Sequence, residues 1–396
     1  MAWLHIILLL VSTVTLAVGQ RCTVRRCKLP NCSCFNTKTP GNLTKNEIPQ
    51  FVMLSFDDAV TIMNFNNTYK KLFMGNYKNK RSGCNIAATF FVTHEYADYQ
   101  LCHELHRYGS EMAVHSISHE ASTEMWKTAD YDRWEDEMVG MRDILSKFAL
   151  IDSGKIKGHR APFLQTAGDV TFEMLNREGF DYDSTMPTLN YAGNDECKGE
   201  DGESEGPMWP YTLNFGYEDQ DCQIEPCPEK KYPGLWEVPL VSYTSVKNTN
   251  FKCSMADACT PYPTTEGDTF EFFKKNFDRH YHCNRAPFPV FLHEAWLQNK
   301  ERHKGYLKFV RWLLENDDIY IVTIQTVLEY MKNPVKLKDY RQANCVTASS
   351  LPPSKCSGPR NCEYKNLEQF YGGTRYMKSC ISCPSTYPWI KKSFWE

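Results

Sequence analysis

The stretch "FVMLSFDDAV" at residues 51–60 decides our interpretation of the fold. Its first half is a short and almost wholly apolar run, as is typical of a parallel strand buried on both faces. Two carboxylates, Asp57 and Asp58, follow directly. Neighbouring side chains on a strand point to opposite faces, so both can serve one site only where the strand gives way to a loop. The alternative is an Asx-type turn that caps a following helix, which would account for one aspartate only.

Similar short runs recur along the chain and alternate with stretches of helical periodicity. Strand–helix alternation is typical of an α/β fold with a mostly parallel sheet. We therefore predict a distorted (β/α) barrel of seven or eight strands with disulfide-rich N-terminal and C-terminal extensions. The pattern fits both a closed barrel and an open sheet. The expected strands are 51–56, 87–92, 111–116, 155–162, 180–186, 235–243, 289–296 and 319–324, and the expected helices are 131–150, 269–282 and 303–316.

Composition and the N-terminus indicate the compartment. The formal net charge of −3 argues against a nucleic-acid partner, which would favour a basic face. The first nineteen residues are typical of a secretory signal, and no later segment is long and apolar enough to span a membrane. All 17 cysteines follow that signal, which favours disulfides and leaves at least one cysteine unpaired. We expect a secreted monomer without a membrane anchor, with glycosylation at the sequons of Asn31, Asn42 and Asn66.

The cysteines also suggest a division of the chain. They crowd the start, a stretch rich in Gly, Pro and Glu, and the last part of the sequence. We expect the C-terminal extension to pack on the barrel as a brace. The predicted segments are a signal peptide at 1–19, a Cys-rich segment at 20–47, a barrel at 48–340 with a Cys-rich insertion near 190–262, and the extension at 341–396.

Polar residues stand at the carboxyl ends of several expected strands. In parallel α/β barrels these ends line one mouth, where the chemistry takes place. We therefore expect the side chains at these strand ends to converge. They are Asp57 and Asp58, His115, Arg160 with Pro162, Asp183, and His293.

The convergence of these residues predicts a metal site. His115 and His119 are four residues apart and would share a face if the segment turns helically. With a carboxylate from another strand they would form a 2-His-1-carboxylate set with open positions for water and substrate. One aspartate would bind the metal, and the other could act as a general base, kept ionised by a cation such as Arg160. His293 could donate a proton to a leaving group, although a lone histidine there is more often a core residue.

The ordered motifs "SFDDA", "HSISH", "RAPF", "YDST" and "FLHEAW" resemble those of the polysaccharide deacetylases of carbohydrate esterase family four, with the NodB-homology fold. "CTVRRCKLPNCSC", "WPYTLNF", "WEVP" and "NRAPFPVFLHEAW" are similar more narrowly to insect chitin deacetylases of the short type, which lack a chitin-binding domain. The resemblance runs from about residue 22 to the C-terminus. One departure is Glu294, which follows His293 where a small residue is usual.

The resemblance implies a role for each matching residue. Asp58, His115 and His119 would bind a divalent metal, usually zinc, with cobalt as another candidate. Asp57 would be the general base, held by Arg160, and His293 the general acid. A backbone N–H near Phe163 would steady the oxyanion. Pro162, Phe163, Trp209, Trp236 and Leu292 would contact the substrate, and either Asp183 or Glu237 would orient His293 or Arg160.

The expected function is that of a secreted, metal-dependent chitin deacetylase. It would hydrolyse the N-acetyl groups of chitin or chito-oligosaccharides, giving chitosan and acetate, in a peritrophic or cuticular matrix. Chitin-binding matrix proteins are further candidate partners. Two alternatives remain open: a chitin-organising matrix protein with little turnover, and a deacetylase of another acetylated glycan such as peptidoglycan or acetylxylan.

Overall fold

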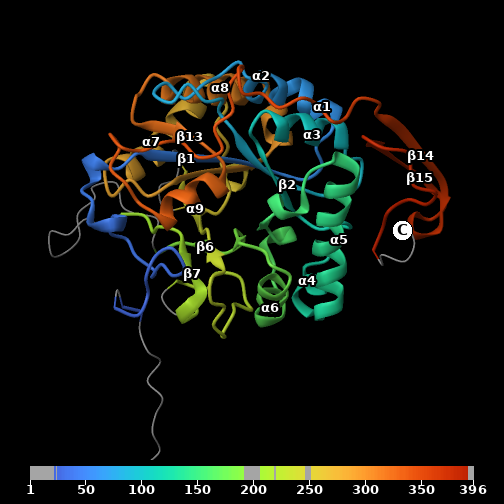
Figure 1. Cartoon of the computed structure of the whole chain (residues 1–396), viewed down its shortest axis with the longest axis horizontal. Helices are drawn as coiled ribbons and strands as arrows, with labels where there is room; N and C mark the ends of the chain where they lie inside the picture. The colour runs from blue at the N-terminus through green and yellow to red at the C-terminus, as the bar shows by residue number, and fades with distance from the viewer. Residues whose placement is uncertain (1–21, 24, 191–205, 218–219, 246–250, 391–396) are drawn as a thin grey trace, which may run out of the picture.

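Strand β1 (Gln50–Asp57) lies at the centre of the structure, a computed structural model that describes residues 22–23, 25–190, 206–217, 220–245 and 251–390 (Figure 1). All eight residues of β1 are buried, because neighbouring strands and helices cover both faces of the sheet. β1 pairs in parallel with strands on both of its sides. The apolar run at residues 51–56 is therefore a strand buried on both faces, as predicted.

The main sheet is curled and almost wholly parallel. β7 alone runs antiparallel, against β8, and β13 (Ile319–Ile321) joins the sheet by pairing with the start of β1. Within the described residues β7 does not pair back to β12, so the sheet stays open. The α/β fold with a distorted barrel is thus confirmed, as a curled half-barrel. In order, its strands are β12 (Phe288–His293), β1, β2 (Ala88–Val92), β3 (Glu111–Val114), β4 (Gly158–His159), β5 (Tyr182–Asp183), β8 (Trp236–Glu237) and β7 (Tyr211–Thr212).

Helix α5 (Tyr131–Ala149) shows how the local sequence sets these elements. The Asp130 side chain accepts a hydrogen bond from the Arg133 N–H and so begins the helix, and Leu150 ends it with a φ of +53°. Its apolar side chains recur on one buried face. The described helices are α1 (Ile62–Asn64), α2 (Lys70–Phe73), α3 (Tyr99–Arg107), α4 (Thr123–Thr128), α5, α6 (Asp169–Arg177), α7 (Glu266–Tyr281), α8 (Lys300–Leu313) and α9 (Ile324–Lys332).

The three predicted helices are confirmed as α5, α7 and α8, whereas the short helices α3, α6 and α9 were not predicted. Several expected strands are much shorter than predicted. The stretch 235–243, expected as one strand, holds two two-residue strands and the first residue of a third, and Ile324 begins α9 instead of ending a strand. The short strands outside the main sheet pair as β6 (Pro187–Thr188) with β9 (Leu240–Val241) and β10 (Tyr243–Thr244) with β11 (Lys252–Cys253).

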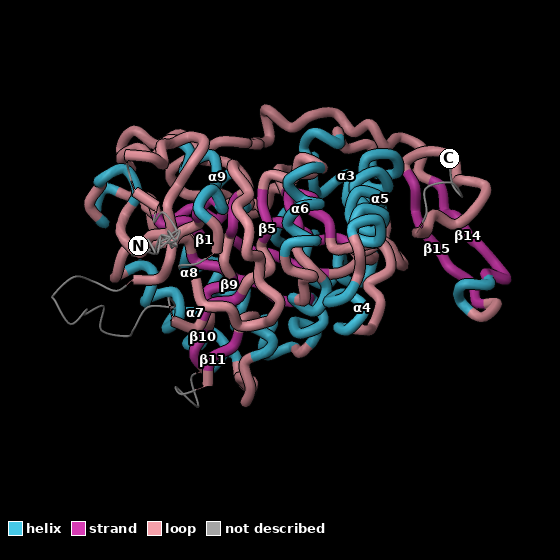
Figure 2. Tube along the Cα trace, turned by 90° about the horizontal axis from the view of Figure 1, so that it is seen from below, coloured by secondary structure: helices cyan, strands magenta, loops and turns pink. Residues whose placement is uncertain are grey.

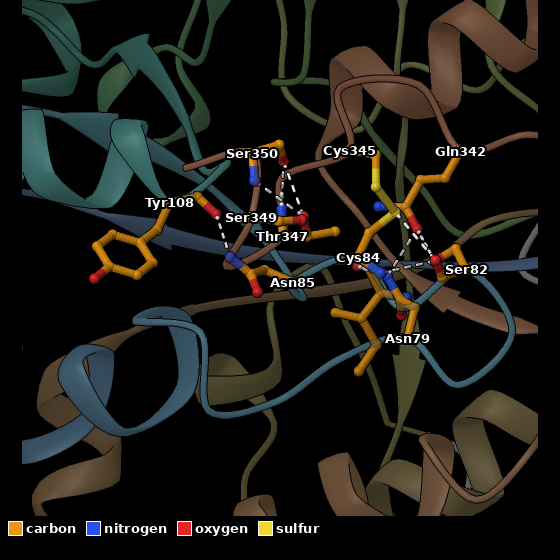
Figure 3. The surroundings of a disulfide bond; sticks show 11 residues. Asn79, Ser82, Cys84, Asn85, Tyr108, Gln342, Cys345, Thr347, Ser349 and Ser350 are labelled. Carbon is orange, nitrogen blue, oxygen red and sulfur yellow. Dashed lines mark hydrogen bonds between the residues drawn. A yellow bond between two sulfur atoms is a disulfide. The ribbon is translucent and has the colours of Figure 1, made fainter. Parts of the chain in front are cut away.

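The C-terminal part of the chain is tied back onto the barrel. The Cys84–Cys345 disulfide joins residues that are 261 positions apart, and the Gln342 side chain accepts hydrogen bonds from Asn79 and Ser82 beside it (Figure 3). Beyond it, β14 (Arg360–Leu367) and β15 (Gly373–Ser379) form an antiparallel hairpin. This hairpin stands at one end of the molecule beside α3 (Figure 1).

Most described cysteines form disulfide bonds, as their number predicted. Within the part of the chain that the structure describes, Cys102 is the free one, and it is buried in α3. The predicted signal at 1–19 and Cys197 lie outside the described residues. Among the helices that the structure describes, none is both long and apolar enough to cross a bilayer. The pairs between described residues include Cys22–Cys34, Cys27–Cys32, Cys84–Cys345, Cys222–Cys227, Cys253–Cys259, Cys356–Cys380 and Cys362–Cys383.

Candidate active site

The two aspartates at the end of β1 occupy different environments. Asp57 is the last residue of the strand, is buried, and lies in register with His293 at the end of β12. Asp58 adopts a φ of +78°, a left-handed conformation that aspartate tolerates better than most residues. This turn leaves Asp58 with about half of its side chain exposed. The strand therefore ends between the two carboxylates, as the shared site requires.

Arg160 holds Asp57 in place. Its Nη1 lies 2.6 Å from Asp57 Oδ1 and also donates to the Ser55 hydroxyl. The guanidinium lies between two aromatic rings, with centroid distances of 3.9 Å to Phe91 and 4.4 Å to Phe291. A planar group gripped in this way has little freedom to move, so the Asp57 carboxylate is held in a fixed position.

The charge of Arg160 also decides the protonation of Asp57. Burial by itself would raise the pKa of the Asp57 carboxyl. The positive charge of Arg160 is the largest of the opposing effects, and together with its hydrogen bond and the charge of His293 it brings the pKa of Asp57 below its usual value. Asp57 is therefore ionised at neutral pH and can accept a proton.

His115 and His119 come together in a loop and not in a helical turn, which corrects the expected local geometry. The chain bends at Ser116 and His119, whose φ angles are +75° and +43°, and the imidazole rings lie 5.0 Å apart. The buried Glu137 of α5 accepts hydrogen bonds at 2.9 Å from the N–H groups of Ile117 and Ser118. Glu137 thus fixes the loop, a role that the sequence did not reveal because glutamate in an amphipathic helix usually faces solvent.

The donor set fits a divalent metal ion. One carboxylate oxygen of Asp58 and one ring nitrogen from each of His115 and His119 lie within 4.8 Å of one another. The Nδ1–H of His115 donates to the Arg160 carbonyl at 2.8 Å, so the lone pair of Nε2 is free to bind a metal ion. Burial lowers the pKa of His115 to about 4, so the ring is neutral, as a metal ligand must be. Two imidazoles and one carboxylate suit zinc or cobalt better than calcium or magnesium.

His293 has a partner that the sequence did not predict. Its Nδ1 lies 2.7 Å from Asp257 Oδ2, so Nδ1 carries a proton and Nε2 faces the site, 3.9 Å from Asp58. Burial would lower the pKa of His293, but the hydrogen bond to Asp257 and the nearby carboxylates raise it to about 9. His293 is therefore protonated at neutral pH, which is the state that a general acid requires.

Asp183 and Glu237 do not orient His293, which corrects one of the expected alternatives. Asp183 Oδ1 lies 2.6 Å from His159 Nδ1, and the Glu237 carboxyl lies buried beside Asp183. Arg160 instead bonds to the carbonyl and hydroxyl of Ser184, the neighbour of Asp183 in the chain. The two carboxyls therefore belong to a buried group one layer behind Arg160.

Three of the expected substrate contacts lie in the core. Trp209 and Trp236 are 1% and 3% exposed and pack in the apolar interior of the curled sheet, and Leu292 is fully buried. None of them therefore forms an open cleft wall. Pro162 is also buried, whereas Phe163 is 45% exposed and its ring centroid lies 4.8 Å from that of His119. Phe163 alone of these five stands openly at the mouth.

The neighbour of His293, Glu294, is held by other residues through one of its carboxylate oxygens. It is buried, and its carboxylate accepts a hydrogen bond from the Thr68 hydroxyl at 2.7 Å and another from Asn67. The unusual residue therefore does not compete with Asp257 for His293. The expected glycosylation sites Asn31, Asn42 and Asn66 are all exposed, and their glycosylation stays a prediction.

An open cavity of about 360 Å³ adjoins this group of residues. Its lining includes Asp58 and His119, together with Thr93, Glu95 and Tyr96 from the loop that follows β2. The cavity therefore gives a ligand access to Asp58 and His119, two of the three residues of the donor set.

The chain is 37% identical to chitin deacetylase 8 of Bombyx mori over 382 residues, which cover 95% of this chain and 93% of the relative. The chain belongs to the chitin deacetylase family. Chitin deacetylase 1 of the same insect is 34% identical, over 93% of this chain and 67% of the relative. This membership confirms the predicted family and the predicted enzyme class, a hydrolase of an acetylated amide.

No family model matches the chain. A solved carbohydrate esterase domain of a xylanase from the hindgut metagenome of Trinervitermes trinervoides is 14% identical over 75% of this chain and all of that domain, with a TM-score of 0.38.

Proposed function

We propose that this chain is a secreted, metal-dependent deacetylase of chitin or chito-oligosaccharides, which releases acetate and leaves glucosamine units. The observation that carries the proposal is the buried Asp57–Arg160 ion pair directly beside the Asp58–His115–His119 donor set. A base, an acid and three metal-type donors in one mouth are what amide hydrolysis needs. The disulfides agree with an oxidising, extracellular compartment.

Each residue has a defined task in this proposal. Asp57 accepts a proton from the water whose oxygen attacks the acetyl carbonyl carbon. His293 delivers a proton from Nε2 to the amide nitrogen as the C–N bond breaks, because its Nδ1 is held by Asp257. The backbone N–H of Phe163 is our candidate donor to the oxyanion. Asp58, His115 and His119 would hold a zinc or cobalt ion, which supplies Lewis-acid polarisation when bound.

The test is acetate release from a chito-oligosaccharide by the zinc-loaded wild-type chain and by the Asp57→Asn variant. We expect the wild type to release acetate and the variant to be inactive while it keeps its metal, because the variant loses the base and none of the ligands. Asp317→Asn is a matched control on an exposed aspartate, and it should behave like the wild type.

Two results would decide against the proposal or part of it. If the zinc-loaded wild type binds chitin without releasing acetate, the chain is a matrix protein and not a deacetylase. If it releases acetate from acetylxylan or peptidoglycan but not from chito-oligosaccharides, the reaction stands and the substrate is wrong. Residual activity of Asp57→Asn would show that the base is another group.

A further inference from the structure

The β14–β15 hairpin is attached to the loop that lines the active-site cavity. The Lys378 N–H of β15 donates to the Ala97 carbonyl at 3.3 Å, and Lys378 and Asp98 form a parallel bridge. This loop follows β2, and its preceding residues Glu95 and Tyr96 line the same cavity as Asp58. Figure 2 shows the hairpin at one end of the molecule, away from the β10–β11 pair.

Arg375 links the hairpin to the cavity wall. Its side chain forms an ion pair with Glu95, and its guanidinium lies 5.4 Å from the centroid of the Tyr96 ring. The same guanidinium stacks on Phe370 at 3.8 Å. Arg375 is mostly buried by these contacts. The surface of the hairpin is therefore continuous with the mouth of the active site.

Three tyrosine rings are exposed along this surface. Tyr96 and Tyr376 are each 51% exposed, and Tyr371 at the turn of the hairpin is fully exposed. The Tyr376 hydroxyl donates to the Glu363 carboxylate at 3.1 Å, and the residue before it, Arg375, contacts Tyr96. Tyr96 and Tyr371 adopt φ angles of +65° and +53°, which bulky residues rarely do. Tyr96 lines the cavity itself, and the other two rings continue the exposed surface along the hairpin that is attached to the cavity loop.

The chemistry around the rings favours a sugar chain as the occupant. The tyrosines are separated by charged and polar side chains such as Glu363 and Lys365, and they do not form a contiguous apolar core of the kind that protein partners bury. A phenol offers a flat apolar face together with a polar hydroxyl. The rings of β-linked N-acetylglucosamine present C–H faces between rims of hydroxyl groups, which match such isolated rings.

We propose that the β14–β15 hairpin extends the substrate site, with the Tyr96, Tyr376 and Tyr371 rings stacking on sugar units of an N-acetylglucosamine chain whose reacting unit lies beside Asp58. The inference rests on the proposed function and goes beyond it, because it gives the C-terminal extension a binding role in addition to that of a brace. The three tyrosine rings would strengthen the binding of long sugar chains more than that of short ones, because only a long chain reaches the hairpin.

The test measures affinity for the N-acetylglucosamine hexamer by calorimetry, in the full chain carrying Asp57→Asn to prevent turnover. We expect the added pair Tyr371→Ala and Tyr376→Ala to weaken binding roughly five- to thirty-fold, as removal of interface aromatics does. Tyr376→Phe keeps the ring and should bind like the parent, which separates stacking from the hydrogen bond to Glu363. Phe251→Ala, an exposed aromatic next to β11, is the matched control.

The same variants in the otherwise wild-type chain give a second measurement, the KM for the hexamer. We expect KM to rise by a similar factor, and the effect to shrink for the dimer. If acetate is released but affinity and KM stay unchanged in the double tyrosine variant, the hairpin proposal is overturned and the proposed function stands. If the wild-type chain neither binds the hexamer nor releases acetate, both proposals fail. If Phe251→Ala weakens hexamer binding as much as the double tyrosine variant does, the effect is not specific to the hairpin and the hairpin proposal is also refuted.

Discussion

The imidazole Nδ1 of His293 lies 2.7 Å from Oδ2 of Asp257, and the His293 backbone N–H donates to the same oxygen at 2.8 Å. Asp257 stands in a 3₁₀ turn of the segment predicted as a Cys-rich insertion, next to the Cys253–Cys259 disulfide, and is only 13% exposed. This part of the chain thus reaches the mouth of the sheet. It fixes both the ring and the backbone of the proposed general acid.

Replacing Asp257 by asparagine should slow the reaction without weakening substrate binding. An amide is a weaker acceptor than a carboxylate, so the His293 ring would lose its fixed orientation. We expect kcat for a chito-oligosaccharide to fall about 10- to 100-fold, with KM little changed. Hydrolysis of an aryl acetate, whose leaving group needs no proton, should be nearly unaffected. Equal losses on both substrates would contradict a role of Asp257 through the general acid.

Metal binding should depend on both histidines of the loop. His115→Ala or His119→Ala should reduce the zinc content after dialysis from about one ion per chain to nearly none, because two ligands cannot replace three. As a second readout, added zinc should raise the melting temperature of the wild type but not of either variant. His282→Ala, on an exposed histidine, is the control and should keep its metal. Retained zinc in His115→Ala would refute the ligand set.

The sequence predicted the residues at strand ends better than those that support them. Asp57, Asp58, His115 and His293 follow apolar runs, and parallel strands bring such positions to one mouth. Asp257 could not be found in this way, because it lies in a loop 36 residues before His293 and belongs to no periodic pattern.

The aromatic residues were predicted less well, for a physical reason. A tryptophan in a two-residue strand gives no alternation that would tell an inward side chain from an outward one. Trp236 therefore suited a cleft wall or the core equally, and it lies in the core. Phe163 is distinguished only by its turn, whose φ of +56° could not be read from the sequence.

The Cys84–Cys345 disulfide should stabilise the chain. It closes the longest loop among the described disulfides, because its two cysteines are 261 positions apart in the sequence. We expect the double change Cys84→Ser and Cys345→Ser to lower the free energy of unfolding by about 2–5 kcal/mol, because the unfolded chain gains conformations. Urea denaturation followed by circular dichroism measures the change. Cys102→Ala, which removes the free thiol, is the control, and a loss no greater than in that variant would contradict the prediction.

Glu237 should make stability fall as the pH rises. Burial, followed by the charge of Asp183, raises its pKa in the folded chain well above the usual value, so the folded state binds this proton more tightly than the unfolded state. Its stabilising contribution is complete below the ordinary carboxyl pKa and is lost as the pH rises toward the folded pKa. Glu237→Gln stays neutral, so its free energy of unfolding relative to wild type should be higher at pH 8 than at pH 5. Urea denaturation at both pH values tests this, with the exposed Glu315→Gln as control, and a difference that does not change with pH would show that Glu237 is ionised in the folded chain.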